Sequence, residues 1–519
     1  MIVARRAAEL AQAMGVVLPD DLALWSLAGG RPAAEPVPGR PEELGELLES
    51  SFDPSARRRQ GAHFTPEAMA AELVSRALAG SERPSVGDPA CGGGALLLAA
   101  ARHLVARGEQ PSEILLRLWG ADVDAVAVAT TEVALTLWAG APPPADRFMV
   151  ADALVAELGW PPLEVVVGNP PFLSQLDAPT TRSPTTTERL RARFGPAVRA
   201  YTDTSGLFLL LACELVAPGG TVAVLQPQSV LAARDAAGVR AAVDACGRLA
   251  EVWFPPGSGF DAAVEVCAPI IQVGESGDGG GWGGHLARAN GVPPVVLSSG
   301  RTLADEATTT AAFRTEYYGM VDHVYEAPDR PDGAPLVTTG LIDLGHCAWG
   351  ERPARIGRRT WQRPVLDVDA LQGRAADWAR RTGVPKLVVA TQTRVVEVVV
   401  DETGGWVPGV PLVVVLAPPE RLWPLAAALA APAVSAWLLA RVAGTALTSQ
   451  SLKVTAALLR EVPLPSDDGA WHRGTGAFRG GDLDAFAEAM GVAYGVDDEV
   501  GDWWRARART VWSRPTPPR

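Results

Sequence analysis

Residues 86–100 read VGDPACGGGALLLAA, and this stretch decides the fold. Val86-Gly87-Asp88 has the pattern of a short strand, a run of glycines follows, and an apolar helix is expected from Ala95. Glycine permits positive φ and lets a backbone approach a ligand closely. A strand, a glycine-rich turn and a helix in this order are typical of the opening of a nucleotide-binding α/β unit. A lone turn of this kind is weak evidence, so the segments downstream matter.

Two further strands are expected to end in acidic residues. The run Leu118–Asp122 places Asp122 at the end of a second strand, where an acid typically holds ribose hydroxyls. We expect Asp124 to cap the next helix instead. The run Phe148–Asp152 supplies a third acid, suited to accept a hydrogen bond from an adenine amino group. Three acid-tipped strands together are far more specific than one.

The tetrapeptide Asn169-Pro170-Pro171-Phe172 follows a fourth apolar strand, Val165–Gly168. An amine on a planar ring is a poor nucleophile, because its lone pair is delocalised into the ring. The Asn169 side-chain oxygen and a backbone carbonyl freed by the prolines can accept its two N–H groups. Phe172 offers a flat face for a flipped base. The alternative is a Pro-Pro turn that closes a strand.

These segments together resemble the S-adenosylmethionine-dependent DNA adenine-N6 methyltransferases of the gamma motif order, the NPPF type of restriction-modification systems. In that order the cofactor motifs and the tetrapeptide precede the target-recognition region. Residues 61–67, GAHFTPE, match the family's G-x-[YF]-T-P segment. The resemblance is strong over about residues 45–275 and thin elsewhere. It implies S-adenosylmethionine as cofactor and no metal.

The resemblance also implies roles for individual residues. The catalytic positions are Asn169, Pro170, Pro171 and Phe172. The cofactor-binding positions are Thr65, Asp88, Ala90, Cys91, Gly92, Asp122, Asp152 and Ala153. One departure from the family is Gln226-Pro227-Gln228, where an x-P-[NS] pattern is more usual. It does not affect the catalytic assignment.

The expected fold class is α/β, with a Rossmann-like doubly wound methyltransferase sheet and a C-terminal mixed α+β domain. Strands and helices alternate from about residue 62 to 275. We expect residues 1–44 to form an N-terminal helical arm and linker, 45–275 the S-adenosylmethionine-binding catalytic domain, and 285–519 a target-recognition domain that binds DNA.

The formal net charge of -13 needs explaining in a protein expected to bind DNA, because DNA binding usually draws on basic surface. Net charge averages over faces that never meet the ligand, so local clusters are more useful. We expect DNA contacts from the arginines beside the catalytic loop, Arg182, Arg189, Arg191 and Arg193. A second cluster lies between Trp349 and Arg381. For each cluster the alternative is a solvated surface, and a partner subunit could supply positive field.

The five cysteines are scattered without a CxxC pair, which argues against zinc and against a disulfide framework. No signal peptide is expected, because Glu9 and Gln12 interrupt any apolar core near the start. The run Leu422–Val442 has about membrane length, but Pro424 and Pro432 favour a buried helical hairpin. We therefore expect a cytoplasmic bacterial enzyme without a membrane partner.

The predicted function is site-specific transfer of a methyl group to the N6 amino group of adenine in DNA, in a restriction-modification or phage-defence system. The expected partners are double-stranded DNA with a flipped adenine and a restriction endonuclease or defence-system subunit. Three alternatives stay open. These are methylation of adenine in RNA, methylation of protein glutamine, and a catalytically silent methylase-like binding subunit. Glutamine methyltransferases lack a long C-terminal extension, and the intact motifs argue against a silent subunit.

Overall fold

A computed structural model describes residues 1–51, 65–173, 182–256, 265–275, 281–312, 314–443 and 451–512. The chain divides into two compact units, Met1–Trp282 and Gly283–Arg519. The division falls between the ranges 45–275 and 285–519 that the sequence analysis gives for the two larger domains.

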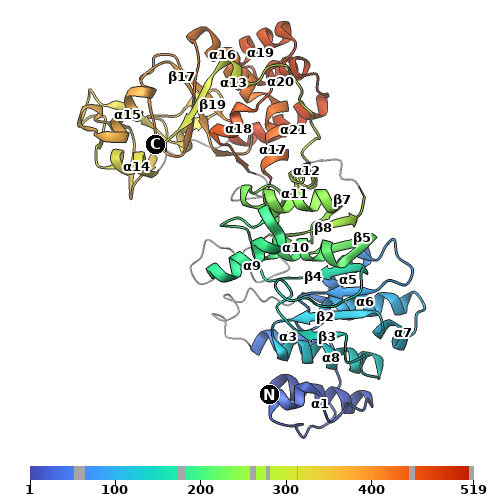
Figure 1. Cartoon of the computed structure of the whole chain (residues 1–519). Coiled ribbons are helices and arrows are strands. Elements are labelled where there is room, and N and C mark those ends of the chain that lie inside the picture. Colours follow the sequence, from blue (N-terminus) through green and yellow to red (C-terminus); the bar gives the residue numbers. More distant parts are fainter. Residues whose placement is uncertain are drawn as a thin grey trace. The chain divides into compact units, whose positions relative to one another are not determined.

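A mixed sheet forms the centre of the first unit, with the strand order β3-β2-β1-β4-β5-β8-β6 and with β7 also paired to β8 (Figure 1). The strands are β1 (Val86–Asp88), β2 (Leu118–Asp122), β3 (Phe148–Val150), β4 (Leu163–Gly168), β5 (Val216–Val224), β6 (Gln226–Pro227), β7 (Gly247–Trp253) and β8 (Val266–Val273). The first five pair in parallel, whereas β8 runs antiparallel to β5, β6 and β7. The predicted α/β class is confirmed.

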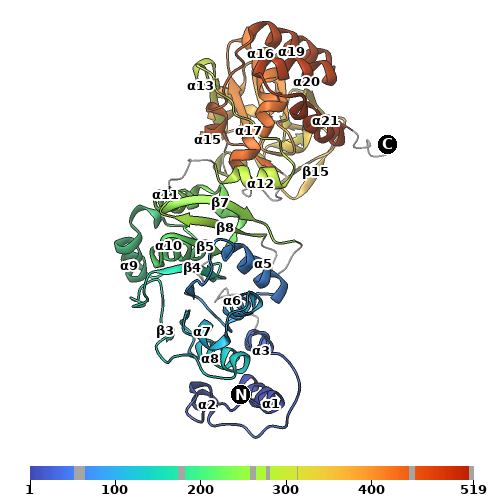
Figure 2. The same cartoon turned by 90° about the vertical axis from the view of Figure 1, so that its right-hand side faces the viewer.

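Helices cover both faces of this sheet. They are α5 (Glu67–Ala77), α6 (Ala95–Ala106), α7 (Pro111–Leu115), α8 (Ala125–Ala139), α9 (Pro184–Phe194), α10 (Thr204–Leu215) and α11 (Ala237–Cys246). Figure 2 shows α5 and α6 on one side of the β4–β5 region and α10 and α11 on the other. Strand β4 is buried at five of its six positions, which is typical of a parallel strand covered on both faces.

The N-terminal helices α1 (Ile2–Met14), α2 (Ala23–Ala28) and α3 (Glu43–Ser51) pack on α8. This packing explains why α8 is apolar all round, because its other side contacts β2 and β3. Leu10 and Trp25 belong to the same apolar core as Val86 and Val165. Residues 1–44, expected as a separate arm, thus share the core of the first unit.

The second unit contains two four-stranded sheets, with the orders β10-β16-β11-β20 and β19-β17-β21-β9. Their strands are β9 (Thr308–Ala311), β10 (Val324–Glu326), β11 (Ala334–Val337), β16 (Pro364–Leu366), β17 (Lys386–Ala390), β19 (Val398–Asp401), β20 (Val407–Pro408) and β21 (Leu412–Leu416). Three two-stranded pairs accompany them: β12 (Ile342–Asp343) with β13 (His346–Cys347), β14 (Ala354–Ile356) with β15 (Arg359–Trp361), and β18 (Gln392–Thr393) with β22 (Leu452–Lys453). Sheets and helices mix as expected for this part of the chain.

The helices of the second unit include a C-terminal group in which α19 and α20 pack together and contact α16 and α21 (Figure 2). Within the described residues its α-helices are α12 (Gly283–Ala289), α13 (Leu303–Glu306), α14 (Arg314–Val321), α15 (Gly373–Thr382), α16 (Pro419–Ala430), α17 (Pro432–Val442), α18 (Ala456–Arg460), α19 (Asp468–Gly480), α20 (Leu483–Tyr494) and α21 (Asp498–Trp512).

Helices α16 and α17 are buried, as the prolines predict for this apolar run. They meet at a bend of 60° next to Ala431, so they form a bent pair of helices where a helical hairpin was expected. Among the described residues, no single helix is both long and apolar enough to cross a membrane, and this bent pair passes that test only when its two helices are taken together.

Candidate active site

A cavity of about 480 Å³ opens at the carboxyl ends of β1, β2, β3 and β4. Every residue predicted to bind the cofactor lines it: Thr65, Asp88, Ala90, Cys91, Gly92, Asp122, Asp152 and Ala153. Asn169 and Pro171 line the same cavity. The structure therefore brings the predicted cofactor residues and the tetrapeptide to one edge of the sheet.

The glycine-rich turn after β1 forms one wall of this cavity. The Asp88 carboxylate accepts the backbone N–H of Ala90 at 3.0 Å, which fixes the start of the turn. Gly92 has φ +53°, a left-handed conformation that favours glycine. A Cβ on Gly93 would stand 2.5 Å from the Cα of Gly45, so a side chain here would collide with α3. Helix α3 thus closes over the turn.

Asp122 and Asp124 form different hydrogen bonds at the end of β2. Asp122 accepts the backbone N–H of Gly92 at 3.0 Å, and burial raises its pKa. Its other carboxylate oxygen accepts the N–H of Asp124 at 2.9 Å. Asp124 caps α8 by accepting the N–H of Val126 at 2.8 Å, which confirms the predicted cap. Asp122 therefore lies between the glycine-rich turn and the start of α8.

Asp88 lies fully within the protein at the end of β1. Burial, with a smaller contribution from the Asp122 charge, raises its pKa to about 7, although the Ala90 N–H opposes the shift. Burial also raises the pKa of the neighbouring Cys91 thiol, so this cysteine is neutral and not a nucleophile at physiological pH. Burial therefore favours the uncharged form of both side chains.

Asn169 is held in place by Thr65, a residue more than one hundred positions earlier in the chain. The Asn169 amide nitrogen donates to the Thr65 hydroxyl at 3.0 Å. Thr65 itself is 4% exposed. This hydrogen bond turns the nitrogen of the amide towards Thr65 and fixes the orientation of the side chain.

The two remaining tetrapeptide residues do not line the cavity. Pro170 is buried at the end of β4, and Phe172 is half-buried and packs against the apolar core. The role of Phe172 in stacking on a base therefore stays a prediction.

The arginines after the tetrapeptide do not form one basic surface. Arg182 lines the cavity and donates to the Thr202 carbonyl at 2.6 Å, and burial lowers its pKa. Arg189 and Arg191 are exposed on α9 and form no hydrogen bond or ion pair with any part of the chain that the structure describes. Only these last two have the free guanidinium that a phosphate contact needs.

The Arg193 guanidinium is bonded within the protein, and its predicted DNA contact stays a prediction. Its guanidinium donates to the carbonyls of Ala153 and Leu154, each at 3.0 Å, and pairs with Glu214 of α10 at 2.9 Å. Ala153 and Leu154 line the cavity. Arg193 thus joins α9, α10 and the loop after β3, and it acts as a positioning residue for that loop.

We expect Arg193→Met to weaken cofactor binding several-fold, because it removes charged hydrogen bonds that are each worth about 1.5–3 kcal/mol, partly offset by water. Calorimetric titration with S-adenosylmethionine measures the effect. Arg191→Met on the same helix is the matched control and should bind like the wild type. Equal affinities for the two variants would contradict the positioning role.

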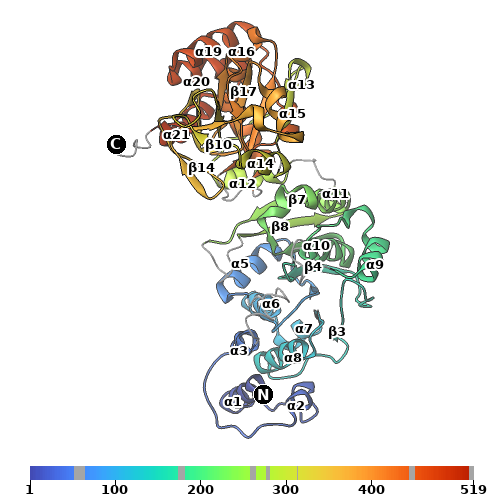
Figure 3. The ribbon, with the colours of Figure 1, turned by 90° about the vertical axis from the view of Figure 1, so that its left-hand side faces the viewer.

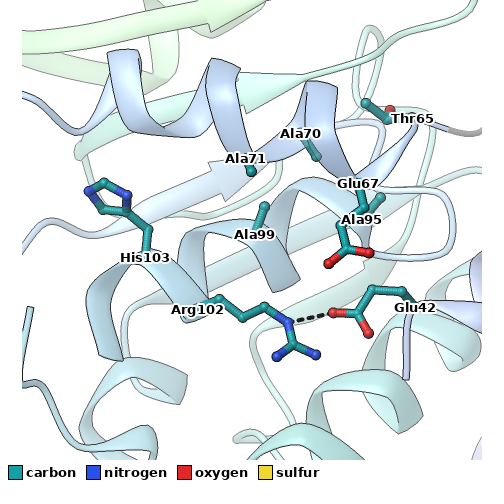
Figure 4. Close-up of a pocket in the computed structure, with 9 residues that line it drawn as sticks. All are labelled: Glu42, Thr65, Glu67, Ala70, Ala71, Ala95, Ala99, Arg102 and His103. Atoms are coloured by element: carbon teal, nitrogen blue, oxygen red, sulfur yellow. Dashed lines mark hydrogen bonds and ion pairs between the residues drawn. The ribbon is translucent and has the colours of Figure 1, made fainter. Parts of the chain in front are cut away.

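A second, smaller hollow of about 140 Å³ lies beside the first (Figure 4). Alanines of α5 and α6 form its wall, and the Glu42 carboxylate meets the Arg102 guanidinium at 2.5 Å across it. Thr65 and Ala95 line both cavities. The Glu42–Arg102 pair ties the segment before α3 to α6, and so helps to hold α3 over the glycine-rich turn.

Several lining residues were not predicted from the sequence. They are Gly45, Leu48 and Glu49 of α3, Thr186 and Leu190 of α9, and Thr204 and Phe208 of α10. Leu190 is buried at a helical spacing from Thr186 and Phe194, so the inner face of α9 could have been found from periodicity. The contribution of α3 has no comparable signal, since it depends on how the N-terminal segment folds back.

The family model described as N-6 DNA Methylase matches residues 43–247. These residues belong to the N-6 DNA methylase family. The match spans the glycine-rich turn, both acid-tipped strands that follow it and the tetrapeptide. It confirms the predicted enzyme class, an adenine-specific DNA methyltransferase. A search of curated proteins finds no match.

Solved structures resemble this chain in fold. The Type IIL restriction-modification enzyme MmeI in complex with DNA has a TM-score of 0.56 and 12% identity, over 92% of this chain and 83% of that chain. The type IIG restriction endonuclease BpuSI has a TM-score of 0.45 and 11% identity, over 98% and 77%. A type I restriction-modification methyltransferase subunit from Streptococcus thermophilus has 0.33 and 20%, over 45% and 49%. The likeness to MmeI concerns the fold, and it includes both units of this chain.

Proposed function

We propose that this chain is a site-specific DNA methyltransferase of a restriction-modification or phage-defence system, and that the 480 Å³ cavity binds S-adenosylmethionine. The observation that carries the proposal is the meeting of the predicted cofactor residues with Asn169 in that single cavity. The family match gives only the reaction class. The residues that line this cavity together are the ones that would carry out the reaction.

The cavity suits the cofactor chemically. The glycine-rich turn leaves room for close backbone approach, Asp122 would accept ribose hydroxyls, and Asp152 would accept from the adenine amino group. Thr65 would lie near the amino-acid end. When bound, S-adenosylmethionine supplies the electrophilic sulfonium methyl group.

The chain's own task is to orient the target amine and to activate it. The Asn169 oxygen would accept one N–H of a flipped adenine and pull the nitrogen towards tetrahedral geometry. The Thr65 hydrogen bond holds that oxygen in a fixed direction. The Asn169 side chain therefore loses little conformational entropy when the target amine reacts. The amine nitrogen would gain the methyl group and lose one proton to solvent during or after the transfer, so no strong general base is required.

As part of the same proposal, we assign recognition of the DNA sequence to the second unit. MmeI, whose fold resembles this chain over 92% of its length, was solved with DNA. The same assignment follows from the gamma motif order, in which recognition elements follow the tetrapeptide. A restriction endonuclease or defence-system subunit would be the partner protein.

The raised pKa of Asp88 predicts a pH effect on stability. In the unfolded chain the carboxyl has its ordinary pKa of 3.8, whereas in the folded protein the pKa is about 7. The folded state therefore holds a proton that the unfolded state has lost, and the stability of the ligand-free protein should fall as pH rises from about 4 to 7. Asp88→Asn should remove this part of the fall, which melting temperatures between pH 5 and 8 would reveal. Parallel pH curves for the two proteins would contradict the prediction.

The function is tested by expressing the chain in cells that lack adenine methylation. Nucleoside analysis should find N6-methyladenine in the DNA, with RNA and protein fractions unchanged. Methylated adenine in RNA or methylated glutamine in protein, without modified DNA, would support the alternative substrates. The absence of any methylated product would support a silent binding subunit.

A further inference from the structure

The arginines of the second cluster differ in whether they have partners inside the protein. Residues 352–366 hold five arginines and no acidic residue, in a chain of net charge -13. Arg352 pairs with Asp343, and Arg363 stacks over the Trp349 ring at 5.2 Å. The other three, Arg355, Arg358 and Arg359, are exposed and form no ion pair with any residue in the described ranges. This short segment therefore carries three positive charges without an ion-pair partner among the described residues.

These three arginines share a two-stranded hairpin. Strands β14 and β15 pair antiparallel, with Arg355 opposite Thr360 and Ile356 opposite Arg359, so Gly357 and Arg358 form the turn. Gly357 has φ +65°, which suits a two-residue hairpin turn. Figure 3 shows β14 at the periphery of the second unit. The hairpin thus presents Arg355 and the two arginines at its tip to solvent.

The body of the unit holds this hairpin in a defined position. The N–H of Gly357 donates to the Tyr317 hydroxyl of α14 at 2.8 Å, and the Trp361 indole donates to the Ile356 carbonyl at 3.3 Å. Ala354 and Ile356 are buried, which anchors the opposite face of β14. Glu326 accepts backbone N–H groups at the base of the hairpin, from Gln362 and Arg363, and leaves the tip without an acid. A ribbon held this way can present arginines at fixed positions.

We propose that the β14–β15 hairpin enters a groove of double-stranded DNA and helps to determine which site is methylated. The proposal rests on the function proposed above and names the reading element within it. A two-stranded ribbon fits the major groove of B-DNA, and arginine is the side chain that most often reads guanine edges there. The charge is complementary, because a polyanion would meet a segment of this acidic chain that holds five arginines and no acidic residue.

The test compares two triple variants of the full chain. The site is first mapped from the adenines that the wild type methylates. Binding to a duplex with that site and to a scrambled duplex is then measured by fluorescence anisotropy. The hairpin variant is Arg355→Gln, Arg358→Gln, Arg359→Gln. The control is Arg374→Gln, Arg380→Gln, Arg479→Gln, which removes the same charge from exposed arginines paired with Glu316, Asp377 and Glu402.

The hairpin variant should lose on the order of tenfold to a hundredfold affinity for the mapped site, and its preference for that site over the scrambled duplex should shrink towards one. The control should keep the preference, and both variants should bind S-adenosylmethionine like the wild type. Unchanged preference in the hairpin variant would overturn the proposal, and so would an equal loss for both duplexes, which would mean phosphate contacts alone. If the wild type methylates no adenine in DNA, the proposed function fails and this inference falls with it.

Discussion

Asn169→Ala should lower the rate of methyl transfer by on the order of a hundredfold or more, as expected when a preorganised electrostatic partner of the reacting group is lost. The Asn169 oxygen is the acceptor that we assign to the target amine, and its direction is fixed by the amide hydrogen bond to Thr65. The substitution removes nothing assigned to the cofactor. Affinity for S-adenosylmethionine should therefore stay within a few-fold of the wild type.

Single-turnover transfer of a labelled methyl group, with calorimetric titration in parallel, measures both quantities. Asn169→Asp is an informative companion, because it keeps an oxygen acceptor and loses the amide donor to Thr65. It should retain more activity than the alanine variant. Transfer at the wild-type rate by Asn169→Ala would show that the tetrapeptide is not the catalytic element.

Asp122→Ala should weaken S-adenosylmethionine binding by about 1.5–3 kcal/mol, the range for losing a hydrogen bond to a charged group. Two effects add here, since Asp122 is the assigned ribose acceptor and also holds the N–H of Gly92 in the glycine-rich turn. Asp124→Ala should instead cost about 1 kcal/mol of folding stability through the lost cap of α8.

Calorimetry and thermal melting of the two aspartate variants separate these effects. The first variant should change the dissociation constant more than the melting temperature, and the second should do the reverse. If Asp124→Ala lost more cofactor affinity than Asp122→Ala, the ribose acid would have been assigned to the wrong residue.

The sequence predicted the cavity well because parallel strands bring their carboxyl ends to one edge. Asp88, Asp122 and Asp152 each follow an apolar strand, so topology alone brings them together. The glycine-rich turn and the tetrapeptide then mark the two ends of the site. The Asp124 cap could also be predicted, because an aspartate directly before an apolar helical run commonly accepts a backbone N–H of the first turn.

The surroundings of the cavity could not be predicted in the same way. Whether Arg193 meets a phosphate or two backbone carbonyls depends on where α9 lies against the loop after β3, and no local pattern encodes that distance. The close approach of Gly45 to Gly93 likewise joins segments that the chain folds together from far apart. The sequence shows where arginines cluster. Only the structure shows which of them are bonded within the protein and which are free to contact DNA.

The measurement that tests the central claim most directly uses the purified full chain, a duplex carrying the mapped site and S-adenosylmethionine labelled on its methyl group. After digestion to nucleosides, we predict that the label appears in N6-methyladenine, that it disappears with Asn169→Ala, and that duplexes without the site remain unlabelled. Label in another nucleoside, in protein or in no product at all from the wild-type chain would contradict the assignment of this cavity to adenine methylation in DNA.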